Sequence, residues 1–213
     1  MNDWNLPPDE IQRRSFAIID WEAPPHQWDP ACWSIIRRMI HTTGDFEFVH
    51  TTRIHPQALA RGMEAIRAGA PIYTDTNMAR AGISRGLLAP FGVEVRCLMG
   101  EETTSELAHQ EGTTRAVAAV DLALDDLEGG IYAVGNAPTA LFRLLEHIQA
   151  GRVRPALVVG LPVGFVNAAE SKQALAQSDQ PYITVSGRKG GSALAAAVIN
   201  ALAQLCREEL EHA

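Results

Sequence analysis

The chain has 213 residues, of which 46% are hydrophobic and 20% charged, and its formal net charge is −7. This composition is typical of one compact globular domain, and the acidic balance argues against nonspecific binding to nucleic acid. No apolar run approaches the roughly 20 residues of a membrane helix, and the first residues lack the pattern of a signal peptide, so we expect a cytoplasmic protein without a membrane contact.

The first quarter of the chain predicts two helical segments and then a strand. Residues 15–20 are a short apolar run that we interpret as an arm or a first helix. Asp29 is a candidate N-cap, Pro30 suits the first turn, and Gly44 is a plausible stop for the following helix. Its buried side would consist of Ile35, Ile36, Met39 and Ile40. Residues 46–54 are rich in β-branched and aromatic side chains and predict a strand.

His41 falls in the last turn of the helix that ends near Gly44. The partial negative charge of a helix C-terminus favours imidazolium, whereas Arg37 and Arg38 oppose it, so titration near neutral pH is physically reasonable. A lone histidine at a helix end is more often a capping or packing residue. This segment alone therefore leaves a catalytic role for His41 open.

From residue 56 onward, predicted helices and strands alternate. Helices are predicted at 56–68, 76–85, 103–127, 138–149, 166–176 and 192–209, and strands at 71–74, 93–99, 131–134, 156–159 and 182–186. Thr103 and Glu106 have the spacing of a capping box, and Gly112 interrupts the helical pattern. Short strands joined by helices predict an α/β fold, with an open, mostly parallel sheet and helices on both faces, formed by residues 1–213 as a single domain.

Three predicted loops from strand to helix are rich in glycine. Gly135 and Asn136 follow one strand, residues 160–164 (GLPVG) follow the next, and residues 187–192 (GRKGGS) precede the last helix. Each loop alone fits ordinary tight strand-to-helix geometry, but three together favour a ligand at the carboxyl edge of the sheet. No Walker A sequence and no GxGxxG is present, which disfavours a nucleotide.

Other candidates are weaker. Asp75 and Met78 follow a strand, where an acidic residue can cap the next helix or contact a ligand, and Arg115 stands at a helix start, where a surface position is the commoner meaning. The remaining histidines have no partners at metal-ligand spacing, so we predict no metal site. The three cysteines are widely separated and predict neither a disulfide framework nor a zinc site. Only two of the 18 basic residues are lysines, and a GC-rich genome is the simpler explanation of that bias.

Six ordered blocks resemble the precorrin-8X methylmutase family, also called cobalt-precorrin-8 methylmutase. They are RSFAIID at 14–20, RMIHTTGD at 38–45, DTNMARAGI at 75–83, VGNAPTAL at 134–141, GLPVGFVNAAESK at 160–172 and GRKGGSALAAAVINAL at 187–202. The resemblance covers nearly the whole chain and leaves residues 1–13 and 203–213 as variable ends. It implies an isomerase of cobalamin biosynthesis that moves a methyl group from C-11 to C-12 of one tetrapyrrole, giving hydrogenobyrinate or its cobalt form.

The resemblance further implies that no cofactor, methyl donor or nucleotide is consumed, and that His41 donates a proton or a strong hydrogen bond to the macrocycle. The substrate is a flat tetrapyrrole polycarboxylate, which needs apolar surface and several fixed cations. Side-chain contacts are expected from Arg14, Ser15, Arg115, Arg188 and Lys189. The pocket is expected to be lined by Asp75, Met78, Gly135, Asn136 and Gly164, although Gly164 can also be purely structural. The family also suggests homodimers with shared sites, and neighbouring corrin-pathway enzymes as partners.

One geometric difficulty follows from the predicted order of elements. A helix antiparallel to the next strand of a parallel sheet would put His41 near the amino ends of the strands, opposite the glycine loops. The conflict disappears if the first helix is not a standard crossover or if two subunits share each site. Two other functions stay open: a non-catalytic protein that binds the corrinoid product and hands it on, and a phosphate-ligand enzyme that uses residues 187–192.

Overall fold

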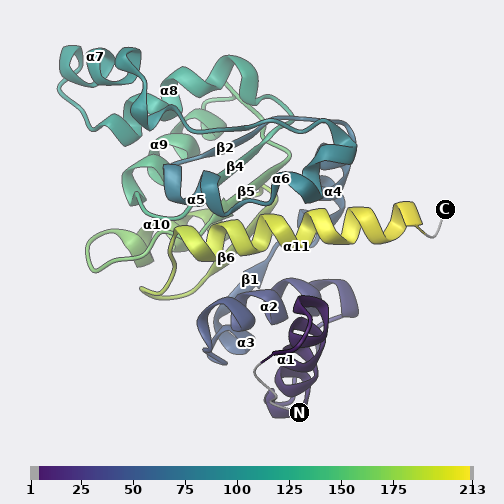
Figure 1. Ribbon diagram of the computed structural model, residues 1–213. Coiled ribbons are helices and arrows are strands. Elements are labelled where there is room, and N and C mark those ends of the chain that lie inside the picture. The colour runs from purple at the N-terminus through teal and green to yellow at the C-terminus, as the bar shows by residue number, and fades with distance from the viewer. Residues whose placement is uncertain (1–4, 212–213) are drawn as a thin grey trace.

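A computed structural model describes residues 5–211 and contains a six-stranded sheet. The strands, which are short, are β1 (Thr52–Ile54), β2 (Ile72–Thr74), β3 (Val95–Arg96), β4 (Ile131–Val134), β5 (Leu157–Gly160) and β6 (Tyr182–Val185). Their spatial order is β1-β6-β5-β4-β2-β3. Figure 1 labels the first five of them. All neighbouring pairs are parallel except β1 with β6, which is antiparallel, with Thr52 opposite Val185. This confirms the prediction of an open, mostly parallel α/β sheet.

Helices cover both faces of the sheet. The α-helices are α1 (Pro8–Glu22), α2 (Pro30–Thr43), α3 (Phe48–Thr51), α4 (Ala58–Arg67), α5 (Asn77–Gly82), α6 (Arg85–Leu88), α7 (Glu102–Gln110), α8 (Arg115–Leu127), α9 (Pro138–Gln149), α10 (Ala168–Ala176) and α11 (Ser192–Glu211). Single 3₁₀ turns lie at Ala89–Phe91 and Leu98–Gly100. One buried cluster joins α2, α4 and α11 to one face of the sheet, and a second joins α8, α9 and α10 to the other.

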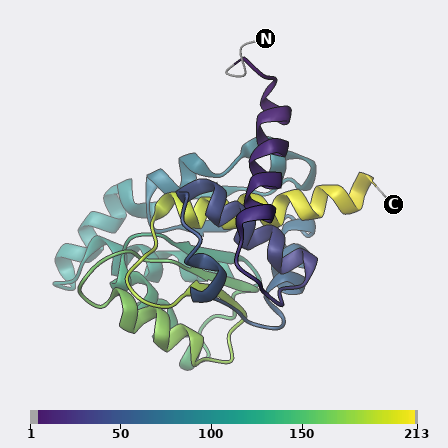
Figure 2. The ribbon, with the colours of Figure 1, turned by 90° about the horizontal axis from the view of Figure 1, so that it is seen from below.

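Helix α11 is the centre of the first layer. It packs along α2 on one side and α5 on the other, and these three elements lie side by side in Figure 1. Four apolar side chains of α2, from Ile35 to Ile40, are at most 1% exposed against this layer. Burying one such side chain contributes about 1.5–3 kcal/mol, so α2 is firmly anchored. In contrast, α1 packs mainly on α2 and stands out from the body of the molecule (Figure 2).

Four sequence predictions differ from the structure. The predicted strand at 46–54 is wrong over Phe48–Thr51, which is a helical turn, because Phe48 and Val49 bury their side chains from a helix instead. The strand predicted at 93–99 keeps only two residues, since a 3₁₀ turn begins at Leu98. The helix predicted at 76–85 divides into α5 and α6 at Ile83 and Ser84.

The fourth difference concerns the predicted capping box. Helix α7 begins at Glu102, so Thr103 lies inside its first turn and no side chain caps this end. The break near Gly112 is confirmed, and Thr114 caps α8 by accepting the backbone N–H of Val117. Helix α1 begins seven residues before the predicted apolar run at 15–20 and runs through Trp21. Residues 1–4 and 212–213 of the variable ends lie outside the described residues. Within residues 5–211, no helix is both long and apolar enough to cross a bilayer.

Candidate functional site

The antiparallel direction of β1 decides where His41 lies. The start of β1 pairs with the end of β6, so the segment that leads into β1 reaches the carboxyl edge of the parallel strands. Helix α2 immediately precedes this segment, so the C-terminal residues of α2 lie at the same edge of the sheet as the glycine loops. Helix α2 is therefore not a standard crossover, and the expected conflict between His41 and those loops does not arise within one chain.

The local sequence of α2 fixes the position of His41. The Asp29 side chain accepts the backbone N–H groups of Ala31 and Cys32 at 3.0 and 2.9 Å, and Pro30 occupies the first turn. Gly44 ends the helix with φ of 68°, a left-handed conformation that suits glycine. Both predicted ends of α2 are thus confirmed, and His41 lies in its last turn with an exposed side chain.

The His41 imidazole meets an aromatic ring and a cation. It packs edge-on against Phe16 of α1, with ring centroids 5.4 Å apart, while the guanidinium of Arg38 lies 4.9 Å from the same ring. Partial burial, and then the positive charge of Arg38, lower the pKa of His41 below its ordinary value of 6.5. These two effects outweigh the helix C-terminus, which alone favours imidazolium. This lowered pKa favours the neutral imidazole of His41 at pH 7.

A groove of about 650 Å³ runs beside His41. One wall comes from α1 and α2, the other comes from residues 82–87, and α11 forms the floor. The floor carries the small side chains of Ala193, Ala196 and Ala197, followed along α11 by the larger polar side chains of Asn200 and Gln204, and it begins next to the glycine loop that precedes α11. The small side chains at one end of the floor, beside His41 and Arg38, leave room for a planar, acidic ligand, and the volume is within the usual range for small-molecule sites.

The loop after β4 is closed by Asp75, which follows β2. The Asp75 carboxylate accepts the backbone N–H groups of Gly135, Asn136 and Ala137 at 2.7–2.8 Å and is 2% exposed. Burial raises the pKa of Asp75, and the three N–H donors act in the opposite direction. These amides, at the start of α9, are thus occupied by a carboxylate of the chain itself. The Asn136 side chain remains exposed.

The loops after β5 and β6 are bonded to each other. The Gly164 N–H donates to the Arg188 carbonyl at 3.1 Å, and the Gly191 N–H donates to the Leu161 carbonyl at 2.8 Å. Gly164 has φ of 148°, a backbone conformation that few other residues adopt. The two segments therefore form one surface at the carboxyl edge, close to the first residues of α11.

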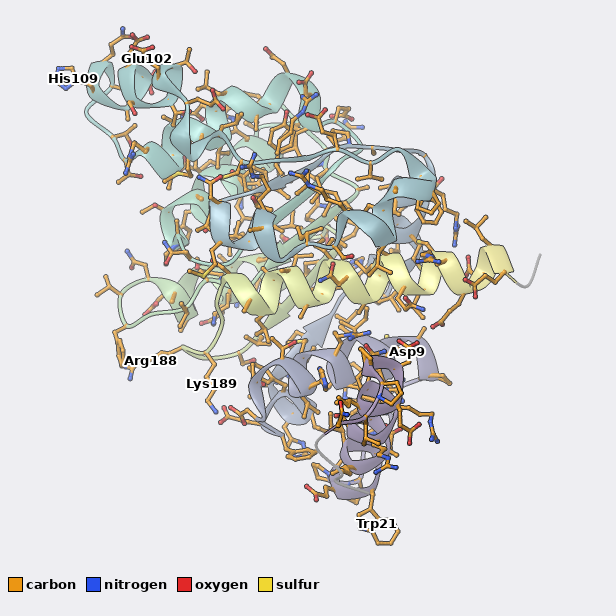
Figure 3. All side chains as sticks on the ribbon, in the orientation of Figure 1. Asp9, Trp21, Glu102, His109, Arg188 and Lys189 are labelled. Atoms are coloured by element: carbon orange, nitrogen blue, oxygen red, sulfur yellow. The ribbon has the colours of Figure 1, made fainter. Side chains whose placement is uncertain are left out.

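The two cations of the 187–192 loop differ in their contacts. The Lys189 ammonium pairs with Asp45 and, at 2.7 Å, with Glu47, which ties the loop to the segment just after His41. The Arg188 guanidinium lies 5.3 Å from the centre of the Phe165 ring, a residue that is 83% exposed. Figure 3 shows both side chains at the edge of the molecule, pointing outward from the loop that precedes α11. Asp45, Glu47 and Phe165 are missed by the sequence analysis, although each lies in or beside a quoted block.

The remaining predicted residues lie on three separate helices. Arg14 pairs with Glu10 at 2.7 Å and the Ser15 hydroxyl donates to the Ile11 carbonyl, both on α1 next to Phe16. Met78, at the start of α5, is 71% exposed. Arg115 begins α8 and is exposed, in the layer on the other face of the sheet. The structure therefore joins Gly164 to Arg188 through their backbones and ties Lys189 to the segment just after His41. It also joins Asp75 to Gly135 and Asn136, and it leaves Arg115 apart.

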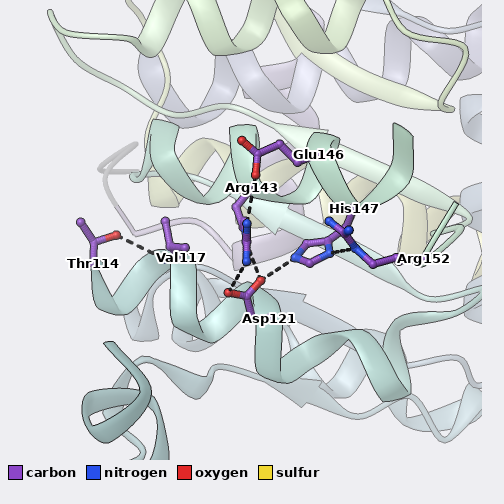
Figure 4. Close-up of polar contacts among 7 residues, drawn as sticks. All are labelled: Thr114, Val117, Asp121, Arg143, Glu146, His147 and Arg152. Atoms are coloured by element: carbon purple, nitrogen blue, oxygen red, sulfur yellow. Dashed lines mark hydrogen bonds and ion pairs between the residues drawn. The ribbon is translucent and has the colours of Figure 1, made fainter. Parts of the chain in front are cut away.

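A second histidine with acidic and basic neighbours lies between α8 and α9 (Figure 4). Asp121 accepts from Arg143 at 2.7 Å and faces the His147 ring at 2.5 Å, while Arg152 donates to the other nitrogen of that ring. His147 is 4% exposed. This fully bonded cluster fastens two helices together, so we interpret it as structural. Within residues 5–211, no three His, Cys, Asp or Glu side chains gather as ligands for a metal ion.

Several known proteins are similar to this chain over most of its length. The family model for precorrin-8X methylmutase matches residues 10–205. A cobalt-precorrin-8 methylmutase from Salmonella typhimurium is 45% identical over 94% of this chain and 97% of its own length, and a precorrin-8X methylmutase from Pseudomonas aeruginosa is 44% identical over 91% and 93%. The solved structure of a precorrin-8X methylmutase from Thermus thermophilus matches with a TM-score of 0.89 and 45% identity, over 94% of this chain and 97% of that one.

Proposed function

Since the chain belongs to the precorrin-8X methylmutase family, we propose that it moves a methyl group from C-11 to C-12 of precorrin-8X or cobalt-precorrin-8, with His41 as the proton or hydrogen-bond donor. The enzyme is a methyl-shifting isomerase of cobalamin biosynthesis. Its product is hydrogenobyrinate or the cobalt form. One carbon–carbon bond breaks and one forms within the same molecule, so atoms and electrons balance without a cofactor.

The observation that carries the role of His41 is its place on the wall of the alanine-floored groove. A donor to the macrocycle must reach the ligand and must hold a proton when the ligand is bound. Burial and Arg38 lower the pKa of His41. A bound polycarboxylate brings negative charge close to the imidazole and raises its pKa, so the substrate itself promotes protonation of the donor.

The substrate-binding residues are proposed in two groups. The first group makes side-chain contacts with the substrate and consists of Arg14, Ser15, Arg115, Arg188 and Lys189. Each of these residues presents a cation or a hydroxyl on an outer helix or loop. Met78, Gly135, Asn136 and Gly164 complete the proposed ligand surface at the carboxyl edge of the sheet, outside the groove that His41 lines. Asp75 acts by holding the Gly135 loop, since its carboxylate oxygens already accept three N–H groups.

We also propose a homodimer of single-domain subunits. The sheet and its two helical layers draw on both halves of the chain, which supports one domain. On α1, Ile11, Ile18 and Trp21 are 46%, 55% and 88% exposed, an apolar surface of the kind that a second copy covers. Light scattering should give twice the mass of the chain for the wild type, and Trp21→Glu should shift it toward the monomer. A wild-type monomer would overturn this part.

The cytoplasm as location and neighbouring corrin-pathway enzymes as partners remain family-based proposals.

The decisive experiment follows the visible spectrum of precorrin-8X during incubation with the purified protein. We expect conversion to hydrogenobyrinate by the wild type, and by the control variant His50→Ala, whose exposed imidazole lies on α3. The His41→Ala variant should bind the product but lose turnover. Equal turnover by His41→Ala would remove His41 from the mechanism. Tight product binding without any turnover by the wild type would instead favour the hand-over protein, and stabilisation by nucleotides but not by corrinoids would favour a phosphate-ligand enzyme.

A further inference from the structure

Lys172 is a buried cation without an acidic partner. It lies on α10 and is 1% exposed, and no ion pair within residues 5–211 includes it. Burial lowers the pKa of its ammonium to about 8. A lysine is rarely buried without a counter-ion, because removal of the charge from water is costly. A side chain of similar size without charge would avoid that cost, so the ammonium calls for a specific explanation.

The contact of the ammonium supplies one. The Lys172 Nζ donates to the backbone carbonyl of Lys189 at 2.5 Å. The adjacent carbonyl, that of Arg188, accepts the N–H of Gly164 from the same segment between β5 and α10. The backbone of the loop is also closely packed, since a Cβ on Gly190 would lie 2.2 Å from the Leu161 carbonyl oxygen. The loop that carries the two cations is thus fixed through the carbonyl groups of two consecutive residues, Arg188 and Lys189.

We infer that Lys172 is a positioning residue, whose ammonium fixes the Lys189 carbonyl and thereby aims the Arg188 and Lys189 side chains at the substrate carboxylates. This inference rests on the proposed function, because it takes those two cations to be substrate contacts. Lys172 itself touches no substrate. It acts through the backbone of the loop, so its effect must depend on the two side chains that the loop presents.

The test is a double-mutant cycle with precorrin-8X turnover and product titration as readouts. Lys172→Met should raise KM and the product Kd about tenfold, with kcat within about twofold, as expected when binding groups are misplaced. Its thermal stability should be equal to or above that of the wild type, because a buried unpaired charge is removed. In an Arg188→Met, Lys189→Met background, which keeps both backbone carbonyls, Lys172→Met should have no further effect on KM.

Two results would overturn the inference. An unchanged KM in Lys172→Met would show that the ammonium does not aim the loop, and a tenfold effect that persists in the double background would show general structural damage. If Lys172→Met does not fold, Lys172→Gln replaces it in the same cycle, since its shorter amide does not reach the Lys189 carbonyl. Failure of the proposed function is seen separately, as absence of turnover in the wild type while product titration still reports on Lys172.

Discussion

The Asp75 carboxylate accepts the backbone N–H of Gly135 at 2.8 Å, which joins the loop after β2 to the loop after β4. The same carboxylate also accepts the next two N–H groups, so the positive end of α9 faces an anion provided by the chain. An acidic residue after a strand thus shapes the carboxyl edge from within. The cations that remain for an acidic ligand are found on the loop after β6 and on the helices around the groove.

Replacement of Asp75 tests this arrangement. In Asp75→Asn the side-chain NH₂ would face a backbone N–H, because only one oxygen remains to accept three donors. We expect a loss of about 2 kcal/mol in the free energy of unfolding, as for buried hydrogen-bonding groups left without partners. Urea denaturation measures it, with Asp125→Asn as the control on the exposed side of α8. Equal stability of both variants would contradict a structural role for the carboxylate.

Gly135 has no room for a side chain. A Cβ at this position would lie 2.6 Å from the Ser192 Cα, so Gly135→Ala must push the β4 loop away from the start of α11. We expect a loss of about 2 kcal/mol in unfolding free energy, as for overpacking of a filled site, together with weaker product binding. Gly86→Ala is the matched control, since its Cβ would meet only the Ser84 hydroxyl at 3.9 Å. Similar stabilities of the two variants would contradict the close contact.

Among the proposed cations, Arg188 should make the strongest contact with an acidic ligand, since its contact within residues 5–211 is the face of Phe165 rather than a carboxylate. Arg188→Met should weaken product binding about tenfold, as for the loss of one charge-assisted hydrogen bond, and should change stability by less than about 0.5 kcal/mol. Arg61→Met on α4, where Arg61 pairs with Glu64, should leave binding unchanged. Titration of both variants with hydrogenobyrinate, followed by absorbance, measures the two dissociation constants. Equal constants would contradict a contact between Arg188 and the ligand.

The acid stability of the protein should depend on Asp121. Burial acts to raise the pKa of Asp121, but hydrogen bonds from Arg143 and His147 hold it below its ordinary value of 3.8. The unfolded chain therefore binds a proton more readily, so the stabilisation is present above the unfolded pKa and is lost as pH falls through about 4 toward the lower folded pKa. Asp121→Asn should lower the urea midpoint at pH 7 and lower it less at pH 3. A difference in urea midpoint between the variant and the wild type that does not shrink at pH 3 would contradict this. The kcat/KM of Asp121→Asn should equal that of the wild type.

The pKa of His41 gives a direct check on its surroundings. Because burial and then Arg38 lower this pKa, Arg38→Gln should raise it toward 6.5. Arg37→Gln should change it less, because the Arg37 guanidinium pairs with Asp20 at 2.9 Å. Imidazole NMR signals followed from pH 4.5 to 8 measure all three proteins. Bound hydrogenobyrinate should raise the wild-type pKa, so binding takes up a proton at pH values between the free and bound pKa. A wild-type pKa above 6.5 without ligand would contradict the described environment.

Local sequence signals predicted the parts of the fold that depend on neighbouring residues. The Asp29 cap, the buried side of α2 and the Gly44 stop are all confirmed, because capping and helical periodicity act within a few residues. The positions of the β4, β5 and β6 strands are likewise close to the prediction. The helical turn at Phe48–Thr51 was missed, since its β-branched and aromatic side chains are also those of a strand.

Relationships between distant residues were beyond the sequence. The direction of β1 is set by its pairing with β6, and three residues of strand carry no signal for it. Asp75 was correctly placed after a strand, but nothing in its neighbours reveals that three amides of another loop occupy its oxygens. The balance at His41 was left between the helix end and the arginines, and it is decided by burial and by the place of Arg38.

The pairing of β1 with β6 also sets the order in which the site can form during synthesis. The segment with His41 belongs to the first quarter of the chain, whereas its neighbours β6 and α11 belong to the last. On the ribosome, α2 is made early, and its apolar side lacks its most extensive native partner until α11 has emerged. The parallel strands β2, β4 and β5 are complete before then. Assembly of the groove is therefore a late event, and a chain that stops before α11 lacks the groove's floor however well its sheet has formed.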